Sequence, residues 1–463
     1  MIRSAVRYVL YPYFSKKDGH SHLFRDLHEL EDSQFWPSSK IEEMQFMKMK
    51  NLLSYAYLNT AFYKRRFDAC GFNPQTMQDF SDVKKIPILT KNDIIKNTDA
   101  LIAYPYTKAD LVYFITGGTT GPGVGLYADK TGFAYKAAVT MRFDKWPGWN
   151  VGEWTSVIWP AVVDFSHDIT LKKKVRNYLS YRKIILQMVT VEQSDIEKHV
   201  KEIIDKKATA VKGFPSQTVD VAGYIIDKGI KLNSVKGVIT TGEPLYSNQR
   251  ELIERAFGCM VYDSYRTRDA GSIAQECEKH RGLHISAESV YVETVDTDLK
   301  NTEDDTSSDP GAGKILVTDL ANYGMPLIRY ENGDIGALSD SGCDCGRGLP
   351  LLKEIGGRLV DVIYTTEGKK IAPVTLIPGM FLYIGIMNQF RIIQESFTHL
   401  RIMIKKPEPD ETLLRKQKEI IHDIFGAAME VSYDFVDDIP PVQSGKFPFI
   451  ISRIPKDLIN RLE

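Results

Sequence analysis

The residues best suited to chemistry in this 463-residue chain form a run of small side chains, Thr116-Gly117-Gly118-Thr119-Thr120-Gly121. Glycine allows positive φ and close backbone approach, and successive backbone N–H groups can form a concave nest for an anion. Threonine hydroxyls add further donors. The apolar run 111–115 before it predicts a strand. We interpret the run as a phosphate-binding loop. A flexible surface turn is the alternative, because neither the dinucleotide fingerprint nor the GK[ST] phosphate loop is present.

Five further motifs carry groups that a bound nucleotide would need. They are Thr241-Gly242-Glu243 after a predicted strand, Tyr265 and Asp269 in the run 262–269 that follows another short strand, Asp334 on a turn with Gly333, Arg358 after two glycines, and Lys446 in Ser444-Gly445-Lys446. The carboxyl edge of a parallel sheet is where α/β proteins bind ligands. Each residue alone has an ordinary interpretation as a turn aspartate, a surface ion pair or a solvated lysine. Their occurrence together indicates nucleotide chemistry.

In this order the motifs resemble the adenylate-forming superfamily over about residues 46–449. Within it, the runs 322–330 (NYGMPLIRY), 343–347 (CDCGR) and 444–447 (SGKF) resemble the phenylacetate–CoA ligase branch and its capsular-polysaccharide-associated relatives. The resemblance implies an α/β fold with a large multi-sheet N-terminal domain, residues 1–358, and a small mobile α+β C-terminal domain, residues 359–463. Residues 1–100 are expected to be mostly helical.

The resemblance also implies a reaction in which a carboxylic acid attacks ATP to give an acyl-adenylate, with Mg²⁺, before the acyl group passes to coenzyme A or another acceptor. It assigns the binding of the triphosphate to Thr116, Gly117, Gly118, Thr119, Thr120 and Gly121, and the binding of the adenine to Thr241, Gly242, Glu243 and Tyr265. Asp334 would bind the ribose, and Arg358 would contact the nucleotide or the hinge. Asp269 would hold Mg²⁺, and Lys446 would be the catalytic residue. A glycan precursor is the alternative acceptor, which would give the protein a role in surface polysaccharide biosynthesis. The resemblance suggests a homodimer.

Two residues depart from the pattern of that superfamily, which has Tyr-Gly-x-x-Glu where this chain has Tyr265-Arg266-Thr267-Arg268-Asp269. Asp269 keeps the charge on a shorter side chain, and Mg²⁺ tolerates this because it retains several waters. One hypothesis is that Arg266 or Arg268 binds an anionic acceptor. Two alternative functions follow: an adenylyltransferase that leaves AMP on its product, and a degenerate nucleotide-binding protein.

Three cysteines and a histidine have the ligand types of a structural zinc site. Cys343 and Cys345 form a tight pair flanked by glycines, and Cys277 with either His280 or His284 would complete a tetrahedron. Thiolates favour zinc over hard cations. Unpaired reduced thiols are the alternative interpretation.

The composition of the chain limits which other classes of protein it can belong to. A net charge of −1 gives no general attraction to nucleic acid, so we expect no nucleic-acid partner. The basic run 172–174 is interpreted as a solvated loop.

The short apolar segment 5–10 is expected to be a packed helix, with an amphipathic helix touching a membrane or partner as the alternative. No apolar stretch approaches the ~20 residues of a membrane span, and no signal peptide is evident. Five cysteines are too few for a disulfide scaffold. We therefore expect a cytoplasmic protein.

The elements that would position these groups follow from periodicity. A helix is predicted over 41–63. Strands at 156–159, 183–186, 210–213 and 237–240 alternate with helices at 194–206 and 216–228, which indicates a parallel sheet. Strands at 290–293 and 314–317 flank an acidic loop, 296–313, interpreted as a long hairpin connection. The last hundred residues predict strands at 391–393, 400–404 and 430–435 and a helix at 411–424.

Overall fold

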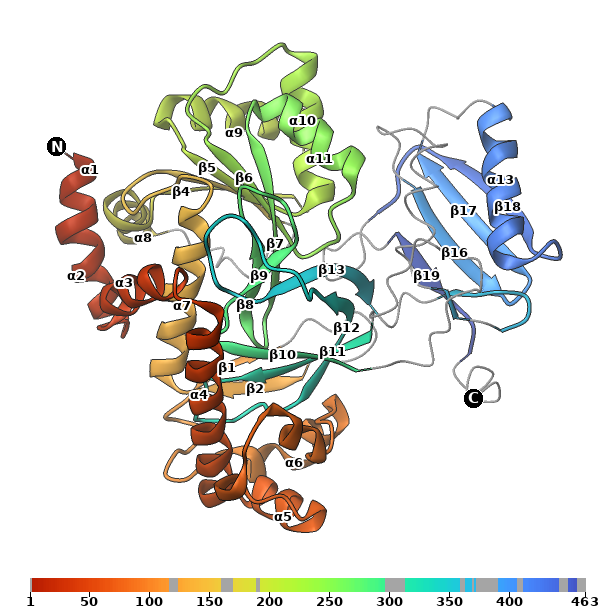
Figure 1. Cartoon of the computed structure of the whole chain (residues 1–463). Coiled ribbons are helices and arrows are strands. Elements are labelled where there is room, and N and C mark those ends of the chain that lie inside the picture. The colour runs from red at the N-terminus through yellow and green to blue at the C-terminus, as the bar shows by residue number, and fades with distance from the viewer. Residues whose placement is uncertain are drawn as a thin grey trace.

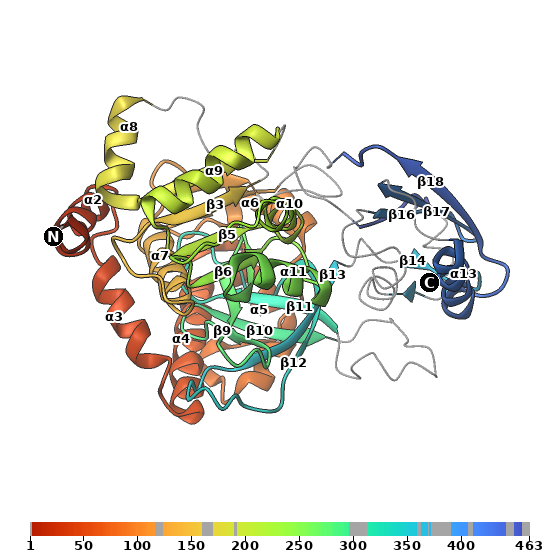
Figure 2. The ribbon, with the colours of Figure 1, turned by 90° about the horizontal axis from the view of Figure 1, so that it is seen from above.

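The structure is a computed structural model that describes residues 2–115, 124–159, 170–188, 192–295, 313–358, 363–368, 370–371, 390–405, 411–440 and 449–455. A large N-terminal part lies beside a smaller C-terminal part, and the two are distinct in both views (Figures 1 and 2). The main helices are α1 Ile2–Ala5, α2 Tyr11–Lys17, α3 Leu23–Ser33, α4 Ser38–Asn59, α5 Ala61–Cys70, α6 Lys91–Leu101, α7 Lys130–Lys145, α8 Leu171–Arg176, α9 Gln193–Lys206, α10 Pro215–Asp227, α11 Ser247–Phe257 and α13 Glu411–Phe425. Short helical turns η1 Val6–Leu10, η2 Pro74–Thr76, η3 Phe80–Lys85 and η5 Asn177–Tyr181 join them.

A single mixed sheet organises the N-terminal part, with the order β10-β11-β12-β13-β9-β8-β7-β6-β5-β3-β4. Its strands are β3 Thr155–Trp159, β4 Lys183–Gln187, β5 Ala210–Gly213, β6 Gly237–Thr241, β7 Met260–Thr267, β8 Gly271–Glu276, β9 Leu283–Ile285, β10 Val290–Val295, β11 Gly313–Asp319, β12 Tyr330–Leu338 and β13 Leu351–Arg358. Strands β4, β3, β5, β6 and β7 run parallel, as the alternation of predicted strands and helices requires.

Helices cover both faces of the parallel half, because successive residues of a strand point to opposite faces. On β5, Val211 packs in a core with α9, α10 and α11, whereas Ala210 packs in a second core with α3 and α7. Burial on both faces explains why these strands are almost continuously apolar.

The antiparallel half matches the expected hairpin around the acidic segment, since β10 pairs with β11 from Val290↔Asp319 to Val295↔Lys314. The connection itself, 296–312, lies outside the described residues. A third core joins this region to the helical N-terminus, where Tyr63 of α5 donates a hydrogen bond to the carbonyl of Pro326 at 3.0 Å. The helix predicted over 41–63 is two helices, because the side chain of Thr60 caps the second one by accepting from the N–H of Tyr63.

The C-terminal part is a four-stranded sheet, β18-β17-β16-β19, with α13 packed on one side. Its strands are β16 Phe390–Ser396, β17 His399–Lys405, β18 Glu430–Val436 and β19 Ile450–Ser452, and a small hairpin of β14 Ile363–Tyr364 and β15 Lys370–Ile371 precedes them. The predicted strands and helix of this region are all present. The mixed α/β architecture with a small C-terminal α+β unit is thus confirmed.

Two local predictions were wrong. The basic run 172–174, expected in a loop, lies in α8, a helix with no buried residue. The run 262–267, expected to follow a short strand, is itself most of strand β7. Among the described residues, no helix is long and apolar enough to span a lipid bilayer.

Candidate functional site

The carboxyl ends of three neighbouring parallel strands converge on one aromatic contact. Trp159 ends β3, Phe214 follows β5 and Gly242 follows β6. The rings of Trp159 and Phe214 meet edge to face with centroids 4.9 Å apart. Gly242 has φ +85°, and a Cβ there would lie 2.4 Å from the Phe214 ring, so only glycine fits. The sheet edge therefore ends in an apolar wall that a planar or aliphatic group can contact.

The polar neighbours of Gly242 differ in what they contact. The Thr241 hydroxyl is buried and has no hydrogen-bond partner among the described residues. The carboxylate of Glu243 accepts hydrogen bonds from the Ser216 hydroxyl at 2.7 Å and backbone N–H at 3.3 Å, at the start of α10. A buried hydroxyl without a partner is costly, which favours a ligand or water at Thr241. Glu243 fixes the loop against the first turn of α10.

A second polar group joins β7, the neighbour of β6, to the more distant strand β12. The Tyr265 hydroxyl on β7 donates to Asp334 Oδ2 on β12 at 2.6 Å, and Asn332 Nδ2 donates to the same hydroxyl. Burial and the Asp334 charge raise the pKa of Tyr265 well above its usual value, so the hydroxyl stays a donor. Arg358 pairs in register with Asp334 on the neighbouring strand β13. Three residues that lie far apart in the sequence thus meet at one place.

Asp334 lies within strand β12, not on an isolated turn as expected. Gly333 beside it has φ +91°, and the Asn332 side chain accepts from the Asp334 N–H at 3.0 Å, so the strand is locally bent. Asn332 is a residue that the sequence reasoning missed. The available signal was its place two residues before Asp334, a spacing typical of Asx turns.

Asp269 lies buried in the turn between β7 and β8. Its carbonyl accepts from Lys136 Nζ at 3.2 Å, and Lys136 also pairs with the buried Asp319. Arg268 of the same turn donates to the carbonyl of Ile115, the last residue of β1 Val112–Ile115, at 3.3 Å. This bond ties the turn to the start of the phosphate-loop candidate. β1 pairs with β2 Gly125–Ala128, as the predicted strand requires.

Several predicted residues lie outside the described residues, namely Thr116, Gly117, Gly118, Thr119, Thr120, Gly121 and Lys446. Their roles stay predictions.

Arg266, the departure from the family pattern, is held inside the protein. Its guanidinium donates to Asp144 Oδ1 at 3.2 Å, Gln275 Oε1 at 2.9 Å and Ser264 Oγ at 2.7 Å. Lys212 pairs with the other oxygen of Asp144. Burial alone would raise the pKa of Asp144, but Lys212 and Arg266 outweigh it and hold the pKa below its usual value. Arg266 therefore completes a buried ion-pair cluster, which argues against its binding an acceptor.

This assignment predicts a stability effect. Arg266→Met removes one of the two cations beside Asp144 and leaves Gln275 and Ser264 without a donor, so we expect a loss of about 1–3 kcal/mol of unfolding free energy. Urea unfolding followed by circular dichroism measures it. The matched control is Arg268→Met, an exposed side chain two residues away, for which we expect about 0.5 kcal/mol or less. Equal effects of the two variants would contradict the assignment.

One aromatic contact joins the two parts of the molecule. Tyr246, the N-cap residue of α11, packs edge to face on Phe449 at a centroid distance of 5.5 Å. Phe449 belongs to the C-terminal core, where its ring lies 5.4 Å from that of Phe390 and its carbonyl accepts from the Ile392 N–H. The C-terminal part is thus held against the loop that follows β6.

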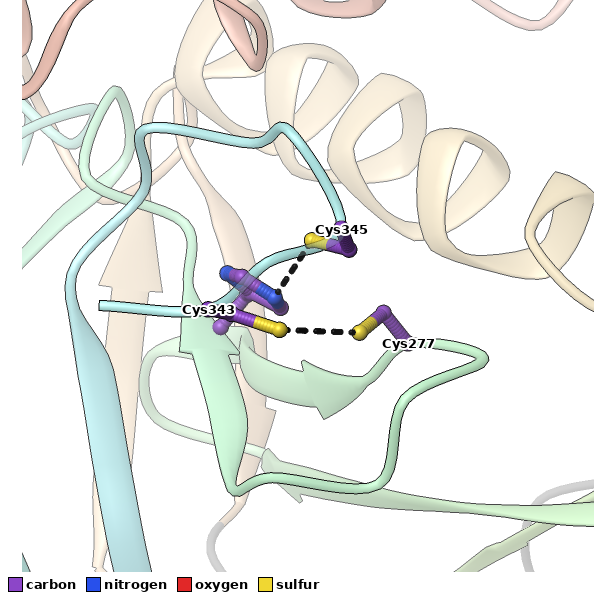
Figure 3. A group of neighbouring side chains, drawn as sticks. Cys277, Cys343 and Cys345 are labelled. Carbon is purple, nitrogen blue, oxygen red and sulfur yellow. Dashed lines mark hydrogen bonds between the residues drawn. The ribbon is translucent and has the colours of Figure 1, made fainter. Parts of the chain in front are cut away.

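A candidate metal centre lies at the other end of the sheet. Cys277 follows β8, His284 is in β9, and Cys343 and Cys345 are in the connection between β12 and β13. Their ligand atoms all lie within 4.8 Å of one another. Figure 3 shows the three cysteine side chains pointing toward a common point. The two chain segments are held together nearby by the short β9–β13 pairing, Leu351↔His284 and Leu352↔Leu283, and by the Arg347–Glu278 ion pair.

The spacing fits a tetrahedral zinc ion. Bonds of about 2.3 Å to sulfur and 2.0 Å to nitrogen give ligand separations of about 3.8 Å for two sulfurs and 3.5 Å for sulfur and nitrogen. The Cys277 and Cys343 sulfurs are 3.7 Å apart, and the Cys345 sulfur is 3.3 Å from His284 Nε2. A disulfide would need about 2.05 Å. The other ring nitrogen of His284 faces the Leu349 carbonyl at 3.4 Å, an orientation common among metal-bound histidines.

His280 is not part of this cluster. Its Nδ1 contacts Glu276 at 3.1 Å and Arg250 at 3.3 Å. The geometry therefore favours His284 over His280, a choice that the sequence left open.

Comparison with known proteins finds relatives that match most of the chain. The CapK C-terminal domain family matches residues 363–453. Protein CapK of Staphylococcus aureus is 22% identical over 456 residues, covering 95% of this chain and 94% of that protein. Phenylacetate-coenzyme A ligase of Thermus thermophilus is 24% identical over 394 residues, covering 84% of this chain and 86% of that protein.

Solved structures agree on the fold. The structure of 2-hydroxyisobutyryl-CoA ligase in the postadenylation state, in complex with R3-HIB-AMP, superposes with a TM-score of 0.70 at 17% identity and covers 93% of both chains. Both the small C-terminal unit and the large N-terminal sheet therefore have counterparts in that ligase. The expected likeness to acid–CoA ligases is confirmed.

Proposed function

We propose that this chain is an AMP-forming acid–CoA ligase of the adenylate-forming superfamily, in the branch that holds CapK and the phenylacetate–CoA ligases. The observation that carries the proposal is the hydrogen bond between Tyr265 and Asp334 near the carboxyl end of β7, beside the end of β6, where Thr241 is in register with Ser264. Thr241, Tyr265 and Asp334 are predicted nucleotide contacts, and they lie on three separate strands. The likeness to the ligases extends over nearly the whole chain.

The proposed chemistry has two steps. A carboxylate oxygen of the acid attacks the α-phosphorus of ATP, the bond from that phosphorus to the bridging oxygen breaks, and pyrophosphate leaves. The sulfur of coenzyme A then attacks the acyl carbon, and the bond to the phosphate oxygen breaks to release AMP. Mg²⁺, when bound, neutralises the phosphate charge; Asp269 is the carboxylate proposed to hold it through water.

The protein's own groups would divide this work. Asp334, oriented by Tyr265 and Asn332, accepts hydrogen bonds from the ribose hydroxyls. Thr241 offers its unpartnered hydroxyl beside the base, and the loop 116–121 holds the phosphates. Lys446 places a positive charge where the α-phosphate and carboxylate gain negative charge, a kind of stabilisation that preorganised groups supply well. Rotation of the unit formed by residues 359–463 would bring Lys446 in for the first step and withdraw it for the second.

The acid is proposed to lie against the wall made by Trp159, Phe214 and Gly242. This wall favours an acid with an apolar body over a short charged one. We also propose a glycan precursor as the alternative acyl acceptor, with a role in surface polysaccharide synthesis. A homodimer and a cytoplasmic location are further proposals.

A pyrophosphate-release assay with a panel of carboxylic acids tests the function. We expect release that depends on both acid and Mg²⁺, followed by AMP and a thioester when coenzyme A is added. An adenylyltransferase would instead keep AMP in the product, and a degenerate nucleotide-binding protein would bind ATP without releasing pyrophosphate. Either result would overturn the proposal.

The proposed role of Asp334 predicts an effect on ATP binding, which can be measured without catalysis. Asp334→Asn keeps the volume of this buried side chain but removes its charge, so we expect ATP affinity to fall about 10- to 100-fold, as for the loss of hydrogen bonds to a charged group. Isothermal titration measures it. Tyr265→Phe keeps the carboxylate and removes only its positioning donor, so a smaller loss of about 2- to 10-fold is expected. An equal affinity of Asp334→Asn and the parent would exclude Asp334 from the nucleotide site.

A further inference from the structure

Two helical segments that are distant in the sequence lie side by side at one edge of the molecule. The first is α1–η1–α2, residues 2–17, and the second is α8–η5, residues 171–181. Tyr11 meets Tyr181 edge to face at 5.7 Å, and the Arg176 guanidinium lies 5.3 Å over the Phe14 ring and pairs with Asp18. Both views place these segments together, on the side away from the C-terminal unit (Figures 1 and 2).

Both segments expose apolar side chains that a monomeric protein would normally bury. Their fractional exposures are 69% for Tyr8, 62% for Val9, 60% for Tyr13, 78% for Leu171, 49% for Val175 and 52% for Tyr178. Leu171, Val175 and Tyr178 recur at i, i+4 and i+7, which places them on one face of their helix. Val9 and Tyr13 have the same spacing of four. The ring of Tyr178 meets that of Trp154 in the core at 5.8 Å, whereas Leu171 and Val175 lie in α8, which has no buried residue.

The same segments are strongly basic in a chain of net charge −1. Each carries four cations and no acid: Arg3, Arg7, Lys16 and Lys17 in the first, and Lys172, Lys173, Lys174 and Arg176 in the second. Arg3 and Arg176 pair with the neighbouring Glu153 and Asp18, which offset part of the charge. Lysines 16, 17, 172, 173 and 174 are all exposed. An exposed apolar stripe bordered by cations is typical of helices that lie in a membrane interface.

We propose that residues 2–17 and 171–181 form a basic, amphipathic face that binds the surface of an anionic lipid bilayer. The lysines attract the lipid headgroups, and the tyrosine and aliphatic side chains enter the interface, where tyrosine is favoured. Nucleic acid fits less well, because it would leave Leu171, Val175 and Val9 in water. A second copy of the chain fits less well, because a symmetric contact would bring two like-charged faces together. The proposal is independent of the ligase function.

Vesicle co-sedimentation of the full chain tests it. We expect the protein to pellet with phosphatidylcholine vesicles that contain 30% phosphatidylglycerol, an amount chosen for a strongly negative surface, and to stay in solution with pure phosphatidylcholine. Lys172→Glu/Lys174→Glu should weaken binding at least about tenfold. Leu171→Ser/Val175→Ser should weaken it at least about fivefold, because the inserted apolar surface is lost. These residues are exposed, so the variants should unfold at the same temperature as the parent.

The matched control is Lys416→Glu/Lys418→Glu on α13, which makes the same charge change on two exposed lysines of the C-terminal unit. It should bind vesicles like the parent. The proposal is overturned if anionic vesicles do not bind the parent, if the control loses as much binding as the α8 variants, or if Leu171→Ser/Val175→Ser binds normally. It is also overturned if an RNA duplex binds as tightly as the vesicles, or if the serine variant abolishes self-association in the absence of lipid.

Discussion

His284→Ala should remove bound zinc from the protein and lower its unfolding free energy by at least about 3 kcal/mol, whereas His280→Ala should do neither. The two histidines lie on the same stretch of chain, but only His284 has a ring nitrogen within reach of the cysteine sulfurs. A structural zinc ion supplies folding free energy directly, because the unfolded chain has no preformed site. His280 instead forms a partly buried contact with Glu276, and its loss should cost about 1 kcal/mol.

Metal analysis of the purified protein by mass spectrometry, together with thermal unfolding, measures both effects. We expect about one zinc ion per chain in the parent and in His280→Ala, and strongly reduced zinc in His284→Ala and Cys345→Ser. Cys70→Ser serves as the cysteine control, since the Cys70 thiol donates to the Phe67 carbonyl at 3.5 Å and is not one of the clustered ligand atoms. Well under one zinc in the parent, or a melting temperature that a chelator leaves unchanged, would exclude a structural metal.

The position of this centre indicates what the metal would do. It would join the turn after β8 to the loop before β13. Cys277 and Cys343, which lie in these two segments, are 66 residues apart in the sequence. Strand β13 ends at Arg358, where the sequence places the border of the C-terminal unit. A fixed β13 therefore keeps Arg358 in register with Asp334. The metal would thus stabilise the strand that ends at Arg358, a residue proposed to contact the nucleotide or the hinge.

Local sequence patterns predicted much of this fold. The apolar runs at 210–213 and 237–240 predict strands, and the helical period of 194–206 predicts the helix between its neighbours, because both signals depend on residues close in the chain. The three cysteines of the candidate metal centre were predicted as a set from their residue type and the close Cys343–Cys345 spacing. His284 and His280 could not be separated, because the choice depends on how β9 pairs with β13.

Long-range partners were the features that the sequence could not predict. Nothing near Arg266 in the chain reveals that Asp144, 122 residues earlier, neutralises it. Without that partner the residue was interpreted as a possible contact for an anionic acceptor. Similarly, the sequence of 172–174 alone indicates a charged loop, because it does not reveal that η5 packs against residues 2–17. Such contacts are set by tertiary packing, which overrides local preference.

The largest effect on activity is expected at Lys446. Lys446→Ala should slow ATP–pyrophosphate exchange by at least about 10³-fold, because the developing charge on the α-phosphate would lose the cation proposed to stabilise it. The second step should be nearly unaffected: transfer from a supplied acyl-adenylate to coenzyme A should stay within about threefold, since the proposed rotation removes the lysine before that step.

Measuring the two half-reactions separately makes this prediction specific. Lys416→Ala, an exposed lysine on α13, is the matched control and should change neither rate. Tyr246→Ala offers an independent check, because its ring contacts Phe449, three residues after Lys446. If that contact holds the unit in position for adenylation, the variant should slow exchange about tenfold while sparing transfer, and Tyr246→Phe should restore it. An equal loss in both half-reactions for Lys446→Ala would mean that the lysine stabilises the fold or both steps alike, and the proposed alternation of the C-terminal unit would then be wrong.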